Sequence, residues 1–205
     1  MERQTGVLNK SLHRFEPRYF GTIRELLEDV RSDATNVVIV GCSDLGAAPD
    51  QLSVAGAERF YKVQNLAATI TPRGELGTPS TIAAIEYAVQ LLHVRHVIVC
   101  GHFGCGIIES WLTKELGDAA AAEAARFHRD VCSLVDQSYT PTSAAERRGL
   151  MVREQVLVQL ENLQSHEFIC SALSETRLRL YGWLVDERTA RIQSFHPDTG
   201  QFAPA

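Results

Sequence analysis

The chain lacks any long apolar segment. No apolar run approaches the roughly 18 to 20 residues that a helix needs to cross a bilayer, and the polar start, residues 1–10, has no signal-peptide core. An excess of positive charge is also missing, because 25 Asp and Glu outnumber 20 Lys and Arg and give a net charge of −5. We therefore expect a soluble cytoplasmic protein without an electrostatic preference for nucleic acid or for an anionic membrane.

The chain has few cysteines, and their number is odd. Five cysteines cannot all form pairs, and a chain of 205 residues that is 45% hydrophobic can bury a core without disulfides. A reduced compartment and metal ligation explain these cysteines better than a disulfide framework does. We expect Cys100, Cys132 and Cys170 to be small core residues. Since the chain also lacks repeats and linkers, we predict one domain, 1–205, in which residues 1–34 form an N-terminal helical arm.

What the chain does contain is an alternation of strand and helix patterns. Short apolar β-branched runs predict strands at 36–40, 59–63 and 96–99, and a final pair at 178–185 and 191–195. Helix-like spacing predicts helices within 15–30 and at 81–92, 107–116, 118–135 and 143–164. This order predicts an α/β fold with a mostly parallel sheet flanked by helices. Ligands of such sheets bind beyond the carboxyl ends of the strands.

Two segments at such strand ends carry metal-binding side chains. Cys42 and Asp44 follow the first strand and project to the same side of an extended segment. His102 and Cys105 follow the third strand and are separated by two residues on a glycine-rich turn. Together they supply two thiolates, one imidazole and one carboxylate, which is a complete ligand set for tetrahedral zinc.

Two other interpretations of these residues remain open at this point. Each cysteine or histidine taken alone is more typical of a buried strand end or of a hydrogen-bonded loop residue. The turn 102–106, which opens a helix, could instead cradle a phosphate, but it lacks the lysine of a GxxxxGK[ST] loop and the spacing of GxGxxG. Five other histidines and the charged residues 126–130 are expected to be exposed to solvent, the histidines being His13, His93, His128, His166 and His196.

The arrangement resembles the β-class carbonic anhydrases. The matching segments are Cys42-Ser43-Asp44-Leu45-Gly46, Gln64-Asn65-Leu66-Ala67-Ala68, residues 80–88, Gly101 to Gly106 and Tyr181-Gly182-Trp183-Leu184-Val185-Asp186. The resemblance covers roughly residues 20 to 195. It implies a dimer or dimer of dimers, zinc bound by Cys42, His102 and Cys105, and interconversion of CO2 and bicarbonate at that zinc.

The departures from the family pattern fall on the loops that face the metal. The family has an arginine two residues after the aspartate, where it holds the carboxylate away from the metal, but this chain has Gly46. Gln64 and Ala68 likewise replace a family arginine and asparagine. Without the arginine, we expect Asp44 to close the zinc shell at neutral pH, unless Lys62, Arg59 or Arg73 supplies another cation.

Three functions fit these observations. The first is a zinc carbonic anhydrase with reduced or conditional activity, in which Asp44 is both a metal ligand and a catalytic residue. The second is a non-catalytic zinc protein that serves as a scaffold or senses an anion. The third is a hydrolase of a CO2 analogue such as carbonyl sulfide or carbon disulfide.

Overall fold

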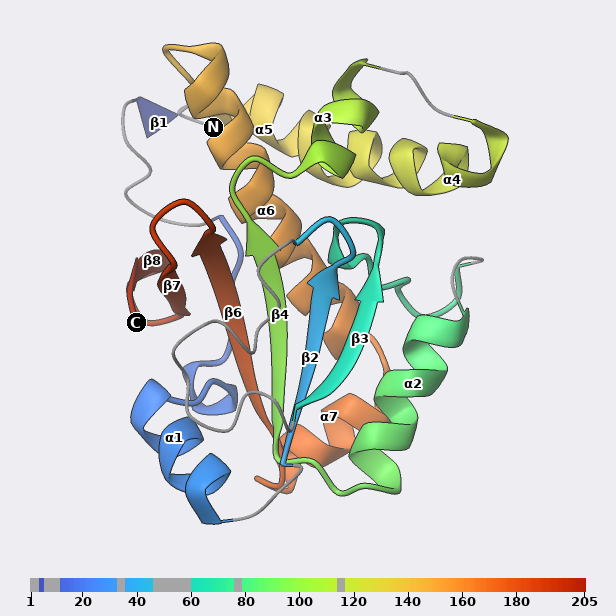
Figure 1. Ribbon diagram of the computed structural model, residues 1–205, viewed down its shortest axis with the longest axis vertical. Coiled ribbons are helices and arrows are strands. Elements are labelled where there is room, and N and C mark those ends of the chain that lie inside the picture. Colours follow the sequence, from blue (N-terminus) through green and yellow to red (C-terminus); the bar gives the residue numbers. More distant parts are fainter. Residues whose placement is uncertain (1–3, 6–11, 33–35, 46–59, 76–78, 114–116) are drawn as a thin grey trace.

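The core of the protein is one six-stranded sheet with the strand order β3-β2-β4-β6-β7-β8 (Figure 1). The computed structural model describes residues 4–5, 12–32, 36–45, 60–75, 79–113 and 117–205. The parallel part consists of β3 (Tyr61–Asn65), β2 (Val37–Cys42), β4 (His96–His102) and β6 (Arg179–Asp186). The antiparallel strands β7 (Arg191–His196) and β8 (Gln201–Pro204) extend it, and β1 (Gln4–Thr5) pairs separately with β5 (Tyr139–Thr140).

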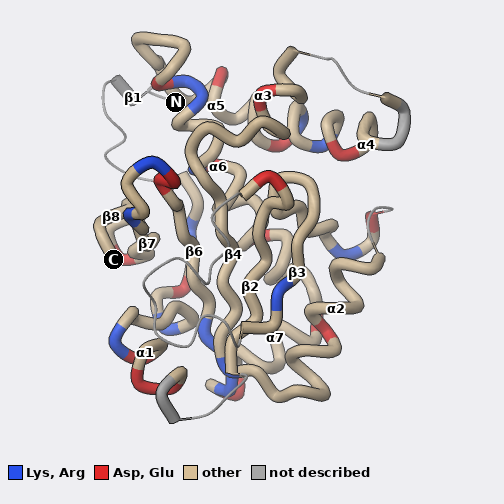
Figure 2. The backbone as a smooth tube through the Cα atoms, viewed as in Figure 1, with Lys and Arg blue, Asp and Glu red and all other residues tan. Residues whose placement is uncertain are grey.

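The central strands are buried because their sequences are almost entirely apolar. Strands β2 and β4 read VVIVGC and HVIVCGH, and Figure 2 shows both without a charged residue. Their register pairs Gly41 with Cys100, so the two carboxyl ends meet at the same edge of the sheet. This edge is where the two predicted metal-binding segments come together.

Helices cover the sheet on its faces and at its ends. The long helix α6 (Ala144–Gln164) crosses one face and packs against β4 and β6 (Figure 1). Close packing requires glycine in the sheet, because a Cβ at Gly101 would lie only 2.7 Å from Val156 Cγ2. The other helices are α1 (Ile23–Ser32), α2 (Pro79–Gln90), α3 (Gly106–Thr113), α4 (Asp118–Phe127), α5 (Ser133–Ser138) and α7 (Glu167–Ser174).

Short helical turns join several of these elements. The 3-10 turn η1 (Pro17–Tyr19) precedes α1, and η4 (Leu66–Ala68) directly follows β3. A π-helical turn, η5 (His128–Cys132), joins α4 to α5 without a break. Helices α3 and α4 lie beyond the carboxyl ends of the parallel strands (Figure 1). The turn η4 contacts β2, β4, α3 and α6, so it lies next to the same edge of the sheet.

The predicted fold class is confirmed, and most elements lie within a few residues of their predicted positions. Apart from short helical turns, four elements were not predicted, namely α7, the edge strand β8 and the two-residue strands β1 and β5. The described part of residues 1–34 contains the short strand β1 as well as η1 and α1, while their role as a helical arm of a single domain stays a prediction. Among the described residues, no helix has both the length and the hydropathy that a membrane crossing requires.

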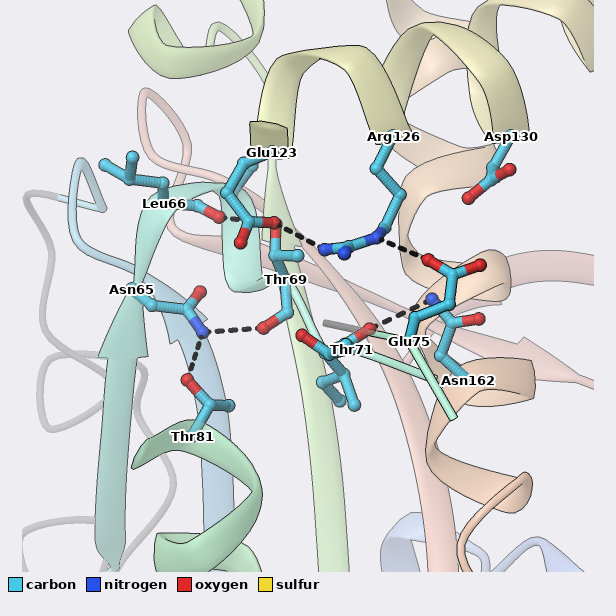
Figure 3. A network of polar contacts seen from close by, with 12 residues as sticks. Asn65, Leu66, Thr69, Thr71, Glu75, Thr81, Glu123, Arg126, Asp130 and Asn162 are labelled. Carbon is cyan, nitrogen blue, oxygen red and sulfur yellow. Dashed lines mark hydrogen bonds and ion pairs between the residues drawn. The ribbon is translucent and has the colours of Figure 1, made fainter. Parts of the chain in front are cut away.

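Three expectations about individual residues are wrong. The imidazole of His13 is 6% exposed rather than solvated, because Nε2 contacts Glu154 Oε2 at 2.8 Å. Arg126 is also buried, since its guanidinium pairs with Glu123 at 2.9 Å and with Glu75 at 3.2 Å (Figure 3). Cys170 lies exposed on α7, whereas Cys100 and Cys132 are buried as predicted.

Candidate metal centre

Three of the four predicted ligands lie together at the carboxyl ends of β2 and β4. Cys42 and His102 are the last residues of these strands, and Cys105 follows a turn in which Gly104 has a φ of +77°. All three side chains are buried, and their candidate ligand atoms lie within 4.8 Å of one another. The glycine permits the left-handed backbone that brings Cys105 back towards His102.

The geometry of this cluster fits a zinc ion. The sulfurs of Cys42 and Cys105 are 3.6 Å apart. Zn–S bonds of about 2.3 Å in a tetrahedral site place two sulfurs roughly 3.8 Å apart. His102 is 2% exposed, and neither of its ring nitrogens has a hydrogen-bond partner in the described part of the chain. A buried ring nitrogen without a hydrogen bond is costly, and a metal ion would supply the missing interaction.

The surroundings favour a thiolate at Cys42, whereas Cys105 carries the proton shared between the two sulfurs. A hydrogen bond from Cys105 lowers the pKa of Cys42 to about 5, and the same interaction raises the pKa of Cys105. The backbone N–H groups of Ile107 and Ile108, at the start of α3, also point at the sulfur of Cys105. Since the N-terminus of a helix carries partial positive charge, this position suits a thiolate ligand.

The environment of His102 is acidic. Burial acts to lower the pKa of His102, but the adjacent Cys42 thiolate outweighs burial and raises it. Glu187 Oε2 lies 3.4 Å from Nδ1 of the ring. Carboxylates next to metal-binding histidines commonly fix the orientation of the ring. Glu187 was not identified from the sequence.

The fourth predicted ligand, Asp44, lies beside the cluster and is held by a backbone N–H group. Its Oδ2 accepts a hydrogen bond of 2.5 Å from the N–H of Gly106, the first residue of α3. The group of atoms within 4.8 Å contains Cys42, His102 and Cys105 and does not include this carboxylate. A side chain at residue 106 would crowd it, because a Cβ there would lie 3.0 Å from Oδ2. Ligation of the metal by Asp44 stays a prediction.

The predicted substitute cations find little support at this site. Arg73 contacts Glu167 at 3.4 Å, at the start of α7, which lies away from the metal-facing loops. Gly46 and Arg59 lie outside the described residues. Lys62 is exposed on the edge strand β3.

Comparison with known proteins decides the family. A family model described as "Carbonic anhydrase" matches residues 37–192, about three quarters of the chain. The chain belongs to the carbonic anhydrase family. It is 29% identical to carbonic anhydrase 1 of Escherichia coli over 168 residues (82% of this chain and 76% of that protein). It is also 29% identical to a carbonic anhydrase of Pseudomonas aeruginosa over 170 residues (82% and 77%).

Solved β-carbonic anhydrases share the fold of this carbonic anhydrase family member. The β-carbonic anhydrase CcaA superposes with a TM-score of 0.71 at 24% identity and covers 89% of this chain and 90% of its own. A tetrameric β-carbonic anhydrase from Sordaria macrospora superposes with a TM-score of 0.67 at 22% identity (88% and 87%). The zinc cofactor implied by the resemblance agrees with the Cys42, His102 and Cys105 cluster.

Proposed function

We propose that this chain is a zinc-dependent carbonate dehydratase that interconverts CO2 and bicarbonate with reduced or conditional activity at neutral pH. The observation that carries the proposal is the buried cluster of Cys42, His102 and Cys105 in a chain of the carbonic anhydrase family. Zinc, when bound, supplies a Lewis acid that makes water acidic near neutral pH. The two cysteines and His102 would hold the ion, and one further position decides activity.

Asp44 controls that position in our proposal. In the structure, Oδ2 of Asp44 accepts the Gly106 N–H, which leaves Oδ1 as the oxygen that can accept a proton or orient a water molecule. Gly46 has no side chain that could hold the carboxylate there, and an exposed carboxylate gains Coulomb energy by moving to a dication. We therefore propose that Asp44 also serves as the fourth ligand, that this position dominates at neutral pH, and that the site opens towards higher pH.

A non-catalytic homologue is the second candidate. Gly46, Gln64 and Ala68 replace three polar residues of the family pattern on the metal-facing loops. A scaffold that binds zinc, or that senses bicarbonate, would keep the metal ligands and lose these groups. A hydrolase of carbonyl sulfide or carbon disulfide would keep the metal ligands as well.

Stopped-flow CO2 hydration from pH 7 to pH 9, on protein of measured zinc content, separates these candidates. We expect zinc-dependent turnover that rises with pH, and a Gly46→Arg variant that is more active at pH 7 than the parent. Gly117→Arg is the control, because Gly117 is exposed and a Cβ there would have no neighbour within 4 Å. A zinc-loaded parent without turnover across this range would favour the non-catalytic candidate or the CO2 analogue.

Assembly and location complete the proposal. A homodimer or dimer of dimers is supported by the Sordaria macrospora protein, which is described as tetrameric and shares the fold. Sedimentation of the zinc-loaded protein would test this. A cytoplasmic location stays a prediction from the sequence.

A further inference from the structure

The backbone next to the zinc ligand Cys42 has an unusual conformation. Ala67, in η4, has φ and ψ of 54° and 29°, and Ala68 has a φ of 55°. Left-handed backbone is uncommon for residues other than glycine, asparagine and aspartate, and here two alanines adopt it in succession. Such a conformation persists only where the surroundings hold it in place.

The conformation of Ala67 aims its N–H at the metal ligand. The backbone N–H of Asp44 donates to the Cys42 sulfur at 3.4 Å, and the N–H of Ala67 faces the same sulfur and acts to lower the pKa of Cys42. Hydrogen bonds to a thiolate stabilise its charge and fix the direction of its lone pairs. The peptide of Ala67 is therefore part of the support of the zinc site, although its side chain contributes only a methyl group.

One buried side chain holds the opposite end of the same residue. Gln155 Nε2 donates to the carbonyl oxygen of Ala67 at 3.0 Å, from the middle of α6. Gln155 is 4% exposed, and its Oε1 has no hydrogen-bond partner within the described residues. Its bond to Ala67 is the only hydrogen bond of this amide in the described part of the structure, so the amide contacts no backbone group other than that of η4.

The rest of the loop is fixed by independent contacts. Asn65 Nδ2 donates to Thr69 O at 2.7 Å and to Thr81 Oγ1 at 2.9 Å, as Figure 3 shows. Gln159 Oε1 accepts the N–H of Ile70 at 2.7 Å, one helical turn along α6 from Gln155. These bonds hold the residues on either side of Ala67, but the carbonyl oxygen of Ala67 itself is held by Gln155.

We propose that Gln155 is a positioning residue for the zinc site, which acts through the Ala67 peptide to hold a hydrogen bond on the sulfur of Cys42. The chain of contacts runs from the Gln155 amide to the Ala67 carbonyl, and from the Ala67 N–H to the thiolate. Loss of the amide donor would leave the buried Ala67 carbonyl without a partner and free the strained peptide to rotate. Supporting groups of this kind typically contribute 10- to 100-fold to metal affinity.

The test is the zinc affinity of Gln155→Met, measured by competition with a chromophoric chelator. Methionine has a similar length but no donor. We expect about tenfold weaker zinc binding and a displaced sulfur-to-metal charge-transfer band in the cobalt-substituted protein. In a Gln155→Met background, Ala67→Gly should recover most of the lost affinity, because glycine adopts the left-handed conformation without strain.

Gln159→Met is the matched control. Gln159 is 3% exposed on the same helix, and its Oε1 accepts the N–H of Ile70 in the same loop rather than contacting Ala67. We expect it to lower stability while leaving zinc affinity and the cobalt spectrum unchanged. If Gln155→Met does not fold, Gln155→Asn keeps a buried amide that is too short to reach Ala67, and it should show the same loss.

Two results would overturn the inference. One is a folded Gln155→Met or Gln155→Asn protein that binds zinc within twofold of the parent with an unchanged cobalt spectrum. The other is an equal loss of affinity in Gln159→Met. The inference rests on the proposed zinc site, but its readouts need no CO2. A parent that binds no zinc would refute the proposed function, whereas a parent that binds zinc without turnover leaves this inference intact.

Discussion

Replacing His13 with glutamine is expected to remove a pH-dependent stabilisation of about 3 kcal/mol. His13 joins the N-terminal segment to α6, because Nε2 contacts Glu154 at 2.8 Å and Nδ1 contacts Glu161 at 2.7 Å. Glu154 is 1% exposed, and the Tyr139 hydroxyl donates to its other oxygen at 2.8 Å. The variant leaves this buried carboxylate without its cation.

The magnitude follows from the pKa of His13. Burial alone would lower this pKa, but the two carboxylates outweigh burial and raise it from 6.5 to about 9. One pKa unit corresponds to about 1.4 kcal/mol, so this rise corresponds to roughly 3 kcal/mol. A raised pKa means that the stabilisation is complete below pH 6.5, where the unfolded chain also binds the proton. It is lost as the pH rises through 9.

Urea unfolding of parent and His13→Gln at pH 6, 7, 8 and 9.5 checks this prediction. The difference in the free energy of unfolding should shrink by about 3 kcal/mol from the lowest to the highest pH. The control is His196→Gln, because His196 is exposed on β7 and its replacement should change little at any pH. A difference for His13→Gln that stays constant within about 0.5 kcal/mol across this range would refute the reasoning, since a purely steric contribution has no pH dependence.

Two further substitutions test packing and capping. Gly101→Ala should lower the free energy of unfolding by about 1 to 3 kcal/mol, because its Cβ would lie 2.7 Å from Val156 Cγ2. Urea unfolding measures this, and a loss no larger than that of Gly117→Ala, where nothing lies within 4 Å, would contradict it. Ser143→Ala should cost about 1 kcal/mol, because the Ser143 hydroxyl accepts the Glu146 N–H at the start of α6. An unchanged unfolding midpoint in urea would argue that water replaces this cap at no cost.

The parts of the fold that follow from local patterns were predictable. The apolar β-branched runs of β2 and β4 are typical of strands that are buried on both faces at the centre of a sheet. Ser143 is a preferred N-cap residue and therefore predicts the start of α6. Strand β8 was missed because QFAP has no strand pattern of its own and becomes a strand only by pairing with β7. The eight-residue α7 is likewise defined by packing on α2 and α6 rather than by strong end signals.

The metal centre likewise contains some residues that the sequence predicts and others that it does not. Cys42, His102 and Cys105 could be grouped from the sequence because parallel strands bring their carboxyl ends to one edge of the sheet. His13 was wrongly expected in solvent, since the buried Glu154 that pairs with it lies 141 residues away in the chain. Ala67 gave no signal because its contribution is a backbone N–H, whose direction depends on a left-handed conformation that alanine does not predict. Gln155 did leave a trace, as a polar residue on the buried face of α6 between Val152 and Val156.

The absence of an arginine at residue 46 shifts the support of the site from side chains to the backbone. A bidentate guanidinium makes two charge-assisted hydrogen bonds to a carboxylate, each worth about 1.5 to 3 kcal/mol, whereas the Gly106 N–H makes one. The N–H of Gly106 therefore holds the Asp44 carboxylate more weakly than the family arginine would. A weak hold makes the position of Asp44 sensitive to competing ligands. This difference in strength is the physical reason to expect a site whose activity depends on pH rather than one that is always open.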